Sequence, residues 1–178
     1  MPVVRKVISY VATSLDGYIA KLEGDISFLS IVEKEGQDYG YGDFIRTIDT
    51  IIVGRKTYDK ILSMGFKYPN DKNVYVITRN ERPDHEGLSF YSGSLKKLVS
   101  ELKNKQGKKI FCDGGSEVIN QLLMDNLIDE FTISVVPLIL GDGIPLFKSK
   151  IPEINLKLVD CQKFDTGLVQ LHYVKTDN

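Results

Sequence analysis

Short apolar segments that suit β-strands alternate with amphipathic segments that suit helices, and this alternation most restricts how the chain can fold. Strands are expected at residues 50–53, 74–78, 88–91, 110–112 and 130–136. Helices are expected at residues 26–32, 55–62, 95–102 and 118–123, with Ser94 as the N-cap of the helix over 95–102. Strands that are joined through helices form parallel sheets with right-handed crossovers. The pattern therefore predicts an α/β fold with a largely parallel sheet.

The two ends of the chain complete this sheet. Residues 4–13 are rich in β-branched and aromatic side chains and are expected to form the first strand. Closing strands at residues 156–164 and 168–176 flank the turn sequence Asp165-Thr166-Gly167, which predicts a hairpin that adds an antiparallel edge. The 178 residues contain no repeat, low-complexity tract or linker, so we expect a single domain over residues 1–178.

Composition excludes several classes of protein. A net charge of −1 without a sustained basic run gives no electrostatic case for nucleic-acid binding. No apolar run approaches the length of a membrane span, and the first residues lack the apolar core of a signal peptide. Cys112 and Cys161 lie in apolar strand-like runs, so both are expected to be reduced core thiols of a cytoplasmic protein. Two histidines without nearby cysteines argue against a zinc site.

Residues 108–119 join an apolar strand to a helix through Gly114-Gly115. Ser116 stands where a helix N-cap belongs, ahead of apolar residues at helical spacing. Paired glycines let a ligand approach the backbone, and the free N–H groups and dipole of a helix start favour an anion such as phosphate. The alternative is a tight strand-to-helix turn without a ligand, and this stretch alone leaves both interpretations open.

Three strand ends carry groups that suit one extended anionic ligand. They are Gly54-Arg55-Lys56-Thr57, Thr78-Arg79-Asn80 and Asp113-Gly114-Gly115-Ser116. The carboxyl ends of parallel strands line one edge of a sheet, where a dinucleotide with a pyrophosphate and an extra phosphate would meet these cations. The alternative is that the cations are solvated surface charges. Neither glycine motif matches the Gly-x-Gly-x-x-Gly fingerprint or a P-loop, which disfavours a standard Rossmann protein or nucleotide triphosphatase.

Four segments, at residues 14–20, 54–58, 113–116 and 137–147, occur together in an order that resembles the dihydrofolate reductase superfamily. The resemblance is closest to the branch that contains the C-terminal reductase domain of the bifunctional riboflavin-biosynthesis protein. It covers residues 4–174 and implies a three-layer α/β/α fold. The implied sheet has eight mostly parallel strands and an antiparallel C-terminal edge.

The resemblance also implies NADPH as cofactor and a cis peptide at Gly114-Gly115. Arg55 and Lys56 would face its 2′-phosphate, Thr57 would face its pyrophosphate, and residues 21–28 would form a mobile loop over its nicotinamide. For Ala12 and Ile19, which would line the nicotinamide, plain core packing is the alternative. The full set implied to contact the cofactor is Ala12, Ile19, Ala20, Gly54, Arg55, Lys56, Thr57, Thr78, Arg79, Asn80, Gly114, Gly115, Ser116, Glu117 and Val118.

The chain departs from true dihydrofolate reductases where their chemistry occurs. Those enzymes use a carboxylate on the helix before the second strand, near a tryptophan, and this chain has no tryptophan. Asp38 and Asp43 are the nearest candidates for this acid, and the alternative is that both are solvated residues at a helix start. A catalytic carboxyl needs partial desolvation to raise its pKa toward working pH. Folate itself is therefore not the expected substrate.

Three functions remain for the chain. The first is an NADPH-dependent reductase of a small heteroaromatic or imine-like substrate of the pterin or pyrimidine type. The second is a nucleotide-binding module of the same fold without turnover, and the third is a structural or oligomeric role without cofactor. The apolar loop at residues 137–147 is either a homodimer contact or part of the core.

Overall fold

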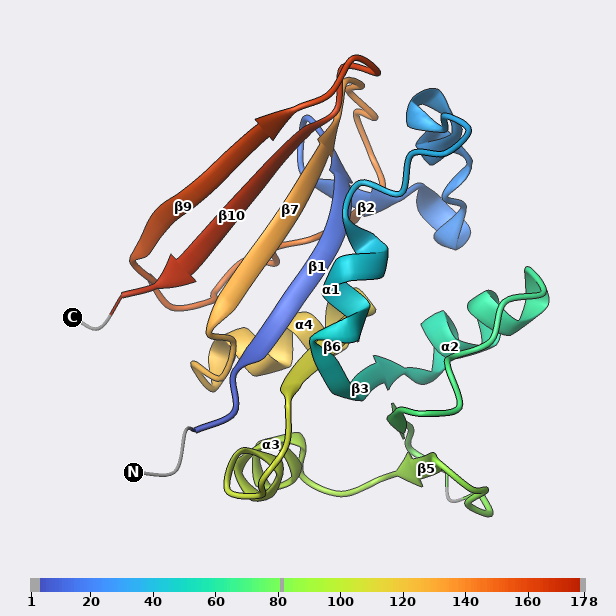
Figure 1. Ribbon diagram of the computed structural model, residues 1–178, viewed down its shortest axis with the longest axis vertical. Helices are drawn as coiled ribbons and strands as arrows, with labels where there is room; N and C mark the ends of the chain where they lie inside the picture. Colours follow the sequence, from blue (N-terminus) through green and yellow to red (C-terminus); the bar gives the residue numbers. More distant parts are fainter. Residues whose placement is uncertain (1–3, 81, 177–178) are drawn as a thin grey trace.

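One eight-stranded sheet forms the middle of the protein, as the computed structural model shows for residues 4–80 and 82–176 (Figure 1). Its strand order is β5-β4-β3-β6-β1-β7-β10-β9. The strands are β1 Val7–Ser14, β3 Ile48–Gly54, β4 Asn73–Ile77, β5 Leu88–Tyr91, β6 Lys109–Gly114, β7 Glu130–Val136, β9 Leu156–Lys163 and β10 Val169–Lys175.

The sheet is parallel from β5 to β7 and antiparallel at its last two strands. β10 pairs antiparallel with β7, and β9 pairs antiparallel with β10. This arrangement confirms the expected mostly parallel sheet with a C-terminal edge hairpin. A small second sheet was not anticipated: β2 (Tyr18–Ala20) pairs antiparallel with β8 (Ile144–Pro145) and holds the apolar loop of residues 137–147 against the turn after β1.

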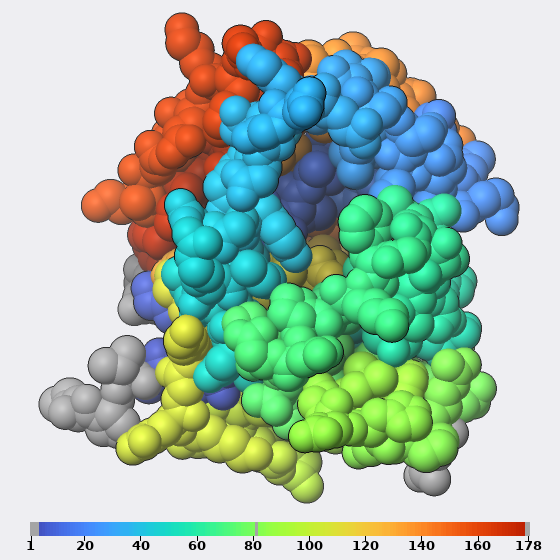
Figure 2. Space-filling model, turned by 45° about the vertical axis from the view of Figure 1, so that its right-hand side comes forward, coloured from blue at the N-terminus to red at the C-terminus, as the bar shows by residue number. Residues whose placement is uncertain are grey.

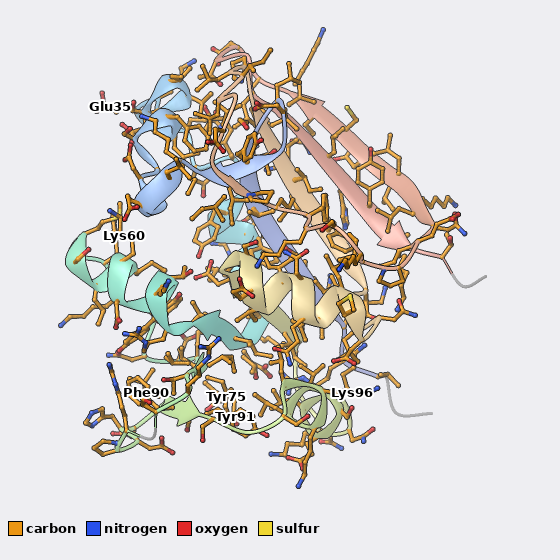
Figure 3. The ribbon with its side chains drawn as sticks, turned by 180° about the vertical axis from the view of Figure 1, so that it is seen from behind. Glu35, Lys60, Tyr75, Phe90, Tyr91 and Lys96 are labelled. Atoms are coloured by element: carbon orange, nitrogen blue, oxygen red, sulfur yellow. The ribbon has the colours of Figure 1, made fainter. Side chains whose placement is uncertain are left out.

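Helices cover both faces of the sheet, which confirms three layers (Figures 1 and 3). Side chains of α1 (Tyr41–Arg46) and α2 (Arg55–Ser63) pack on one face, and those of α3 (Leu95–Lys103) and α4 (Ser116–Met124) pack on the other. Residues 22–24 and 27–32 form short 3₁₀ helices, η1 (Leu22–Gly24) and η2 (Ser27–Val32), where only an amphipathic helix over 26–32 was expected. None of the helices in the described ranges is long and apolar enough to cross a membrane.

The apolar run of β6 is required because this strand is buried on both faces of the sheet. Ile110 and Cys112 belong to the core beneath α3 and α4, whereas Phe111 belongs to the core beneath α1 and α2. All three side chains are at most 1% exposed. A strand that is buried on both faces has no polar alternation, as the sequence indicated.

The helix starts agree only in part with the sequence. Ser94 caps α3 as expected, because its hydroxyl accepts a hydrogen bond of 3.3 Å from the Lys97 N–H. The N-cap prediction for Ser116 is wrong: Gly115 is the N-cap of α4, and Ser116 is its first residue. The Ser116 hydroxyl instead donates a 2.8 Å hydrogen bond to the Pro145 carbonyl, so it fastens β8 to α4.

The two cysteines differ in their surroundings. Both are free thiols, and Cys112 is buried, but Cys161 is exposed. The prediction of two core thiols is therefore wrong for Cys161. It lies on β9, an edge strand whose eight residues are all exposed, so an apolar strand pattern there does not mark the core.

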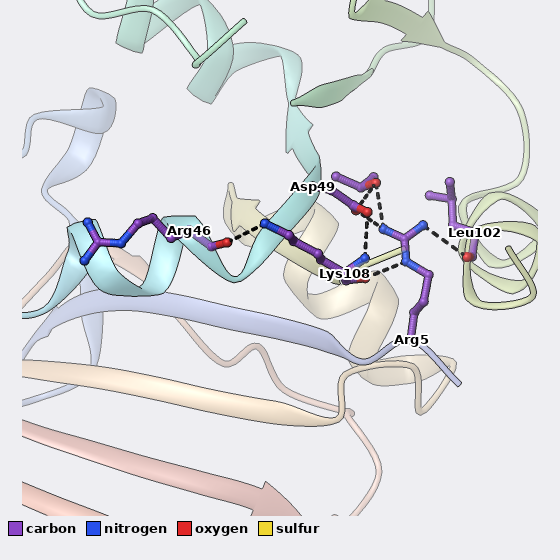
Figure 4. A network of polar contacts seen from close by, with 6 residues as sticks. Arg5, Arg46, Asp49, Leu102 and Lys108 are labelled. Atoms are coloured by element: carbon purple, nitrogen blue, oxygen red, sulfur yellow. Dashed lines mark hydrogen bonds and ion pairs between the residues drawn. The ribbon is translucent and has the colours of Figure 1, made fainter. Parts of the chain in front are cut away.

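A buried arginine joins four segments at the amino ends of the strands (Figure 4). Arg5 is 5% exposed, and its guanidinium donates to the carbonyls of Lys108 at 2.6 Å and Leu102 at 3.3 Å. It also donates to the Thr50 hydroxyl at 2.8 Å and forms an ion pair with the Asp49 carboxylate. These partners belong to the start of β3, to α3 and to the residue before β6. Arg5 therefore holds these segments in register with one another at the amino ends of the strands.

Replacing Arg5 with Met should lower the free energy of unfolding by about 2–4 kcal/mol, because it removes a buried guanidinium that pairs with Asp49 and donates to the Thr50 hydroxyl and two carbonyls. Urea unfolding followed by circular dichroism measures this change. Arg46→Ala is the matched control, since the Arg46 side chain is 73% exposed and pairs with exposed Asp43. This control should change stability by less than about 0.5 kcal/mol. Equal effects of the two substitutions would contradict the role of Arg5.

Candidate functional site

The three predicted strand ends lie side by side. β4, β3 and β6 are neighbours in the sheet, and their last residues are level: Gly54 pairs with Ile77, and Val53 pairs with Gly114. Thr78 follows directly on β4. The segments that begin at Gly54, Thr78 and Gly114 therefore share one edge of the sheet, as the sequence analysis required.

The turns after β3 and β6 bring two helix starts together. The Gly114–Gly115 peptide is cis, as the resemblance implied. A Cβ atom on Gly54 would lie 3.3 Å from the Gly115 nitrogen, and one on Gly115 would lie 2.8 Å from the Thr57 hydroxyl oxygen. Side chains would therefore not fit between these backbones. The free N–H groups and dipoles of α2 and α4 favour an anion here, so these residues fit a pyrophosphate.

Cations surround the start of α4. The Glu117 carboxylate forms an ion pair with Lys148, and this hydrogen bond, with the charges of Arg79 and Lys56, holds its pKa below the usual value. Lys56 and Arg79 thus lie within electrostatic reach of one helix start, although they come from different strand ends. Arg55 is directed along α2, where its guanidinium pairs with Asp59 at 2.9 Å. Both of these side chains are about two-fifths exposed, so Arg55 can turn toward an anion.

A hollow opens beside this edge (Figure 2). It is bordered by the segment before α1, by residues of the η1–η2 region and by α2, and β1 is visible at its floor. Exposed apolar side chains stand on two of these bordering segments: Leu22 in η1 is 60% exposed, and Phe66 after α2 is 62% exposed.

Asp113 is the charged residue of this region that the sequence analysis missed. The Tyr68 hydroxyl donates a hydrogen bond to its Oδ2. Asp113 keeps some exposed surface, yet neighbouring atoms enclose it, and this desolvation raises the pKa of its carboxyl to about 6 against the lowering effect of Tyr68. Within residues 4–80 and 82–176 it forms no ion pair.

A register shift explains why Asp113 could not be placed from the sequence. Ile52 of β3 pairs with Cys112, but the next residue, Val53, pairs with Gly114. Asp113 is thus an extra residue in β6, and such bulges redirect side chains next to functional sites. The signal available in the sequence was its position, a lone acid directly before paired glycines at a strand end.

Aromatic rings stand near the carboxyl. Tyr68 stacks on Tyr58, with ring centroids 6.2 Å apart and an interplanar angle of 4°. Burial and the charge of Asp113 raise the pKa of Tyr41 to about 12, which indicates that the Tyr41 hydroxyl faces the same region from α1. We call the surroundings of the Asp113 carboxyl and the rings of Tyr41, Tyr58 and Tyr68 the aromatic recess, and its flat rings suit contact with a planar molecule.

Residues 5–170 match the family model that describes the RibD C-terminal domain. The chain belongs to this family. The Bacillus subtilis (strain 168) protein YwjB is 43% identical over 176 residues, which cover 96% of this chain and 98% of YwjB.

Solved structures of other proteins share the fold of this RibD C-terminal domain. A Shewanella sp. PV-4 protein assigned to riboflavin biosynthesis has 29% identity and a TM-score of 0.87, and the match covers 97% of this chain and 99% of the other. Dihydrofolate reductase from Enterococcus faecalis, solved with NADP(H) and RAB-propyl, has 17% identity and a TM-score of 0.64 over 97% of each chain. The dihydrofolate reductase therefore shares the fold that the resemblance implied, and the match to the RibD C-terminal domain confirms the resemblance to the riboflavin-biosynthesis branch.

The two acids suggested by comparison with dihydrofolate reductases lie in solvated positions. Asp38 accepts hydrogen bonds from the Gly40 and Gly42 N–H groups at the start of α1, and these bonds lower the pKa of its carboxyl. Asp43 is 82% exposed and pairs with Arg46. Neither carboxyl has the desolvated surroundings that a proton donor near neutral pH requires. Both positions match the alternative of solvated residues at a helix start.

The residues expected near the nicotinamide lie on β1 and β2. Ala12 is half-buried on β1, Ile19 packs partly against the core beneath α4, and Ala20 is 6% exposed. The loop that follows is held by local bonds. Lys21 pairs with Asp25 at 3.1 Å, and the Ser27 N–H donates to Asp25 at 2.9 Å.

Asp113→Asn should stabilise the RibD C-terminal domain at neutral pH. The carboxyl has a pKa near 6 in the folded state and about 3.8 when unfolded, so the folded state holds more protons between these values. The free energy of unfolding therefore falls as pH rises through this window and stays lower above it, by about 3 kcal/mol. Urea unfolding across this pH range should show the decline in the wild type and not in the variant. Asp142→Asn, on an exposed loop, is the control, and the same decline in Asp113→Asn would refute the raised pKa.

Proposed function

We propose that this protein is an NADPH-dependent reductase of a small heteroaromatic or imine-like compound of the pterin or pyrimidine type. The observation that carries this proposal is the contact between the Gly54 and Gly115 turns, which places two helix starts beside an aromatic recess with a desolvated carboxyl. Membership of the RibD C-terminal domain family supports a reductase of the riboflavin-pathway type. Bound NADPH would supply the hydride, and the protein would bind and orient the substrate and supply its proton.

The cofactor would lie along the edge formed by β3, β4 and β6. Its pyrophosphate would face Thr57 on one side and residues 114–118, which include Ser116, Glu117 and Val118, on the other. Lys56, Arg79 and Arg55 would pair with the 2′-phosphate, because guanidinium and ammonium groups bind phosphate oxygens strongly. Thr78 and Asn80 would lie near the adenosine, where the Thr78 hydroxyl already accepts a hydrogen bond of 3.2 Å from the Asn80 N–H.

The reacting end of the cofactor would lie toward β1 and β2, against Ala12, Ile19 and Ala20. The recess with Tyr41 and Tyr68 would then take the substrate ring. A planar heterocycle suits it, since the walls are aromatic and Asp113 offers one polar contact. This arrangement would bring hydride, ring and carboxyl together in one place.

A second candidate function is a nucleotide-binding module without turnover. It is favoured by the solvated positions of Asp38 and Asp43, which leave the helix acid of dihydrofolate reductases without an equivalent. In either case we infer a single cytoplasmic domain that acts on small molecules and not on nucleic acid, in line with its net charge of −1. A role without any cofactor would leave the glycine contact unexplained.

NADPH fluorescence titration tests the cofactor, and NADPH oxidation tests turnover. We expect saturable binding at micromolar protein and oxidation with at least one compound among pteridines and deaminated aminopyrimidine precursors of riboflavin. Binding without oxidation of NADPH would select the binding module. Absence of binding would exclude both candidates.

Arg55→Ala should weaken NADPH binding more than NADH binding, by roughly 1.5–3 kcal/mol, because only NADPH carries the phosphate that a guanidinium would pair with. Parallel fluorescence titrations with both nucleotides measure the difference. Lys60→Ala is the control, because Lys60 is an exposed cation at the far end of the same helix (Figure 3). Equal losses for both nucleotides would remove Arg55 from the phosphate site.

We propose further that the chain forms a homodimer through β9. The loop at residues 137–147 is only partly internal: Leu138 and Leu140 pack in the core near η2 and Leu146 is 2% exposed, but Ile139 is 67% and Phe147 is 44% exposed. β9 is instead exposed along its whole length, with Leu158 48% and Val159 55% exposed. An uncovered edge strand with apolar side chains invites pairing with another chain, and a two-fold axis lets two copies cover each other.

Val159→Glu should convert such a dimer to a monomer, because it places a like charge near the two-fold axis and removes apolar contact. Size-exclusion chromatography with light scattering measures the mass of each variant. Ile139→Ser is the control, since Ile139 is 67% exposed on the loop and lies away from β9 in sequence. A wild-type monomer at micromolar concentration would refute the dimer, and a monomer produced only by Ile139→Ser would place the contact on the loop.

A further inference from the structure

The proposed reduction requires a proton as well as a hydride, and the positions suggested by comparison with dihydrofolate reductases do not supply it. Asp38 is engaged with backbone N–H groups, and Asp43 is solvated beside Arg46. Asp113 differs from both. It stands one residue before the cis Gly114–Gly115 peptide, so it adjoins the proposed cofactor edge.

The contacts of Asp113 leave one oxygen available. Oδ2 accepts the hydrogen bond from Tyr68, and no group of the described chain donates to Oδ1. Tyr68 is itself fixed by stacking on Tyr58 of α2. One oxygen of the Asp113 carboxyl is therefore held by Tyr68 and the other is not, and Asp113 keeps some exposed surface.

The ionisable groups that face Asp113 from the surrounding elements are tyrosine hydroxyls and a cysteine thiol, which carry no charge near neutral pH. Tyr68 comes from the segment after α2, Tyr41 comes from α1, and Tyr10 of β1 lies beyond Tyr41, with ring centroids 5.8 Å apart. Cys112 on the same strand packs in the core on the other face of the sheet. No cation among these groups opposes protonation of the carboxyl.

Building on the reductase function proposed above, we propose that Asp113 donates the proton in the reduction of a C=N bond and that Tyr68 is its positioning residue. When the carbon of the substrate's C=N bond accepts hydride from the reduced nicotinamide, the π electron pair moves to nitrogen. That nitrogen forms an N–H bond with the proton of Oδ1 as the O–H bond of Asp113 breaks. Solvent then returns a proton to the carboxylate, and oxidised nicotinamide is the other product.

Tyr68 has two physical effects in this step. Its hydrogen bond to Oδ2 fixes the orientation of the carboxyl, so the proton on Oδ1 is directed away from Tyr68. The same bond stabilises the carboxylate that remains after transfer, because a hydrogen bond to a charged acceptor is stronger than one to a neutral acceptor. Desolvation and this bond act in opposite directions and leave the pKa at about 6, close to working pH, where a general acid is most effective.

The titration of Asp113 can be measured without cofactor. NMR of protein with isotope-labelled aspartate carboxyls should show one signal with a midpoint near 6, and this signal should be absent in Asp113→Asn. In Tyr68→Phe the midpoint should move upward, because the carboxylate loses its hydrogen-bond donor. An aspartate signal at this position with an ordinary midpoint would overturn the proposal.

Single-turnover oxidation of NADPH with 7,8-dihydropterin, a cyclic imine, tests the catalytic step. The wild-type rate should fall about tenfold per pH unit above the midpoint, since only protonated Asp113 donates. Asp113→Asn should lower the rate by about 10²–10³-fold and remove this pH dependence, while NADPH affinity changes less than about twofold. Tyr68→Phe should keep the pH dependence with its midpoint moved upward. Asp71→Asn, on the same connection as Tyr68, should behave as wild type.

The outcomes separate this proposal from the reductase function itself. A wild-type rate and pH profile in Asp113→Asn would overturn the role of Asp113 and leave the reductase proposal standing. A loss of turnover in Asp38→Asn but not in Asp113→Asn would move the role to α1. No NADPH oxidation by the wild type would overturn the reductase proposal and the proton donor together.

Discussion

The site depends on the contact between two backbone turns, at Gly54 and at Gly114-Gly115. A Cβ on Gly115 would lie 2.8 Å from the Thr57 hydroxyl oxygen, and one on Gly54 would lie 3.3 Å from the Gly115 nitrogen, so the two turns approach this closely because neither carries a side chain. This contact sets α2 and α4 beside each other with their amino ends together. It also determines where the strand pairing of β3 and β6 must end, at Val53 and Gly114. The position of α2 beside α4, the end of the β3–β6 pairing and the anion-favouring site between the two helix starts thus all require that Gly54 and Gly115 carry no side chain.

Most of the fold could be predicted from the sequence, because its determinants are local. Apolar runs marked the strands, Ser94 marked a helix start, and Asp165-Thr166-Gly167 marked the hairpin. The errors arose where partners distant in sequence decide the outcome. The Ser116 hydroxyl bonds to the Pro145 carbonyl instead of capping α4. Cys161 is exposed because no strand or helix of the described residues covers β9.

The candidate site likewise has one part that could be predicted from local sequence and one part that could not. The proposed cofactor edge is made of backbone and of residues next to glycines, so short motifs reveal it. The proposed substrate recess is made of side chains from α1, from β6 and from the segment after α2, and no motif connects Tyr68 with Asp113. The bulge at Asp113 adds a further obstacle, because strand alternation does not predict the direction of an extra residue.

Asp113 also shows how function and stability oppose each other in this protein. A carboxyl that is enclosed without a cation destabilises the folded state once it ionises, and a core-forming residue at the end of β6 would avoid that loss. Phe111, two residues earlier on the same strand, shows such packing, with 0% exposure. An acid in place of an apolar residue has a physical reason only if the recess receives a ligand that needs a proton or a polar partner. The destabilising position of Asp113 is therefore itself an argument that the recess is a reaction site and not unfilled core.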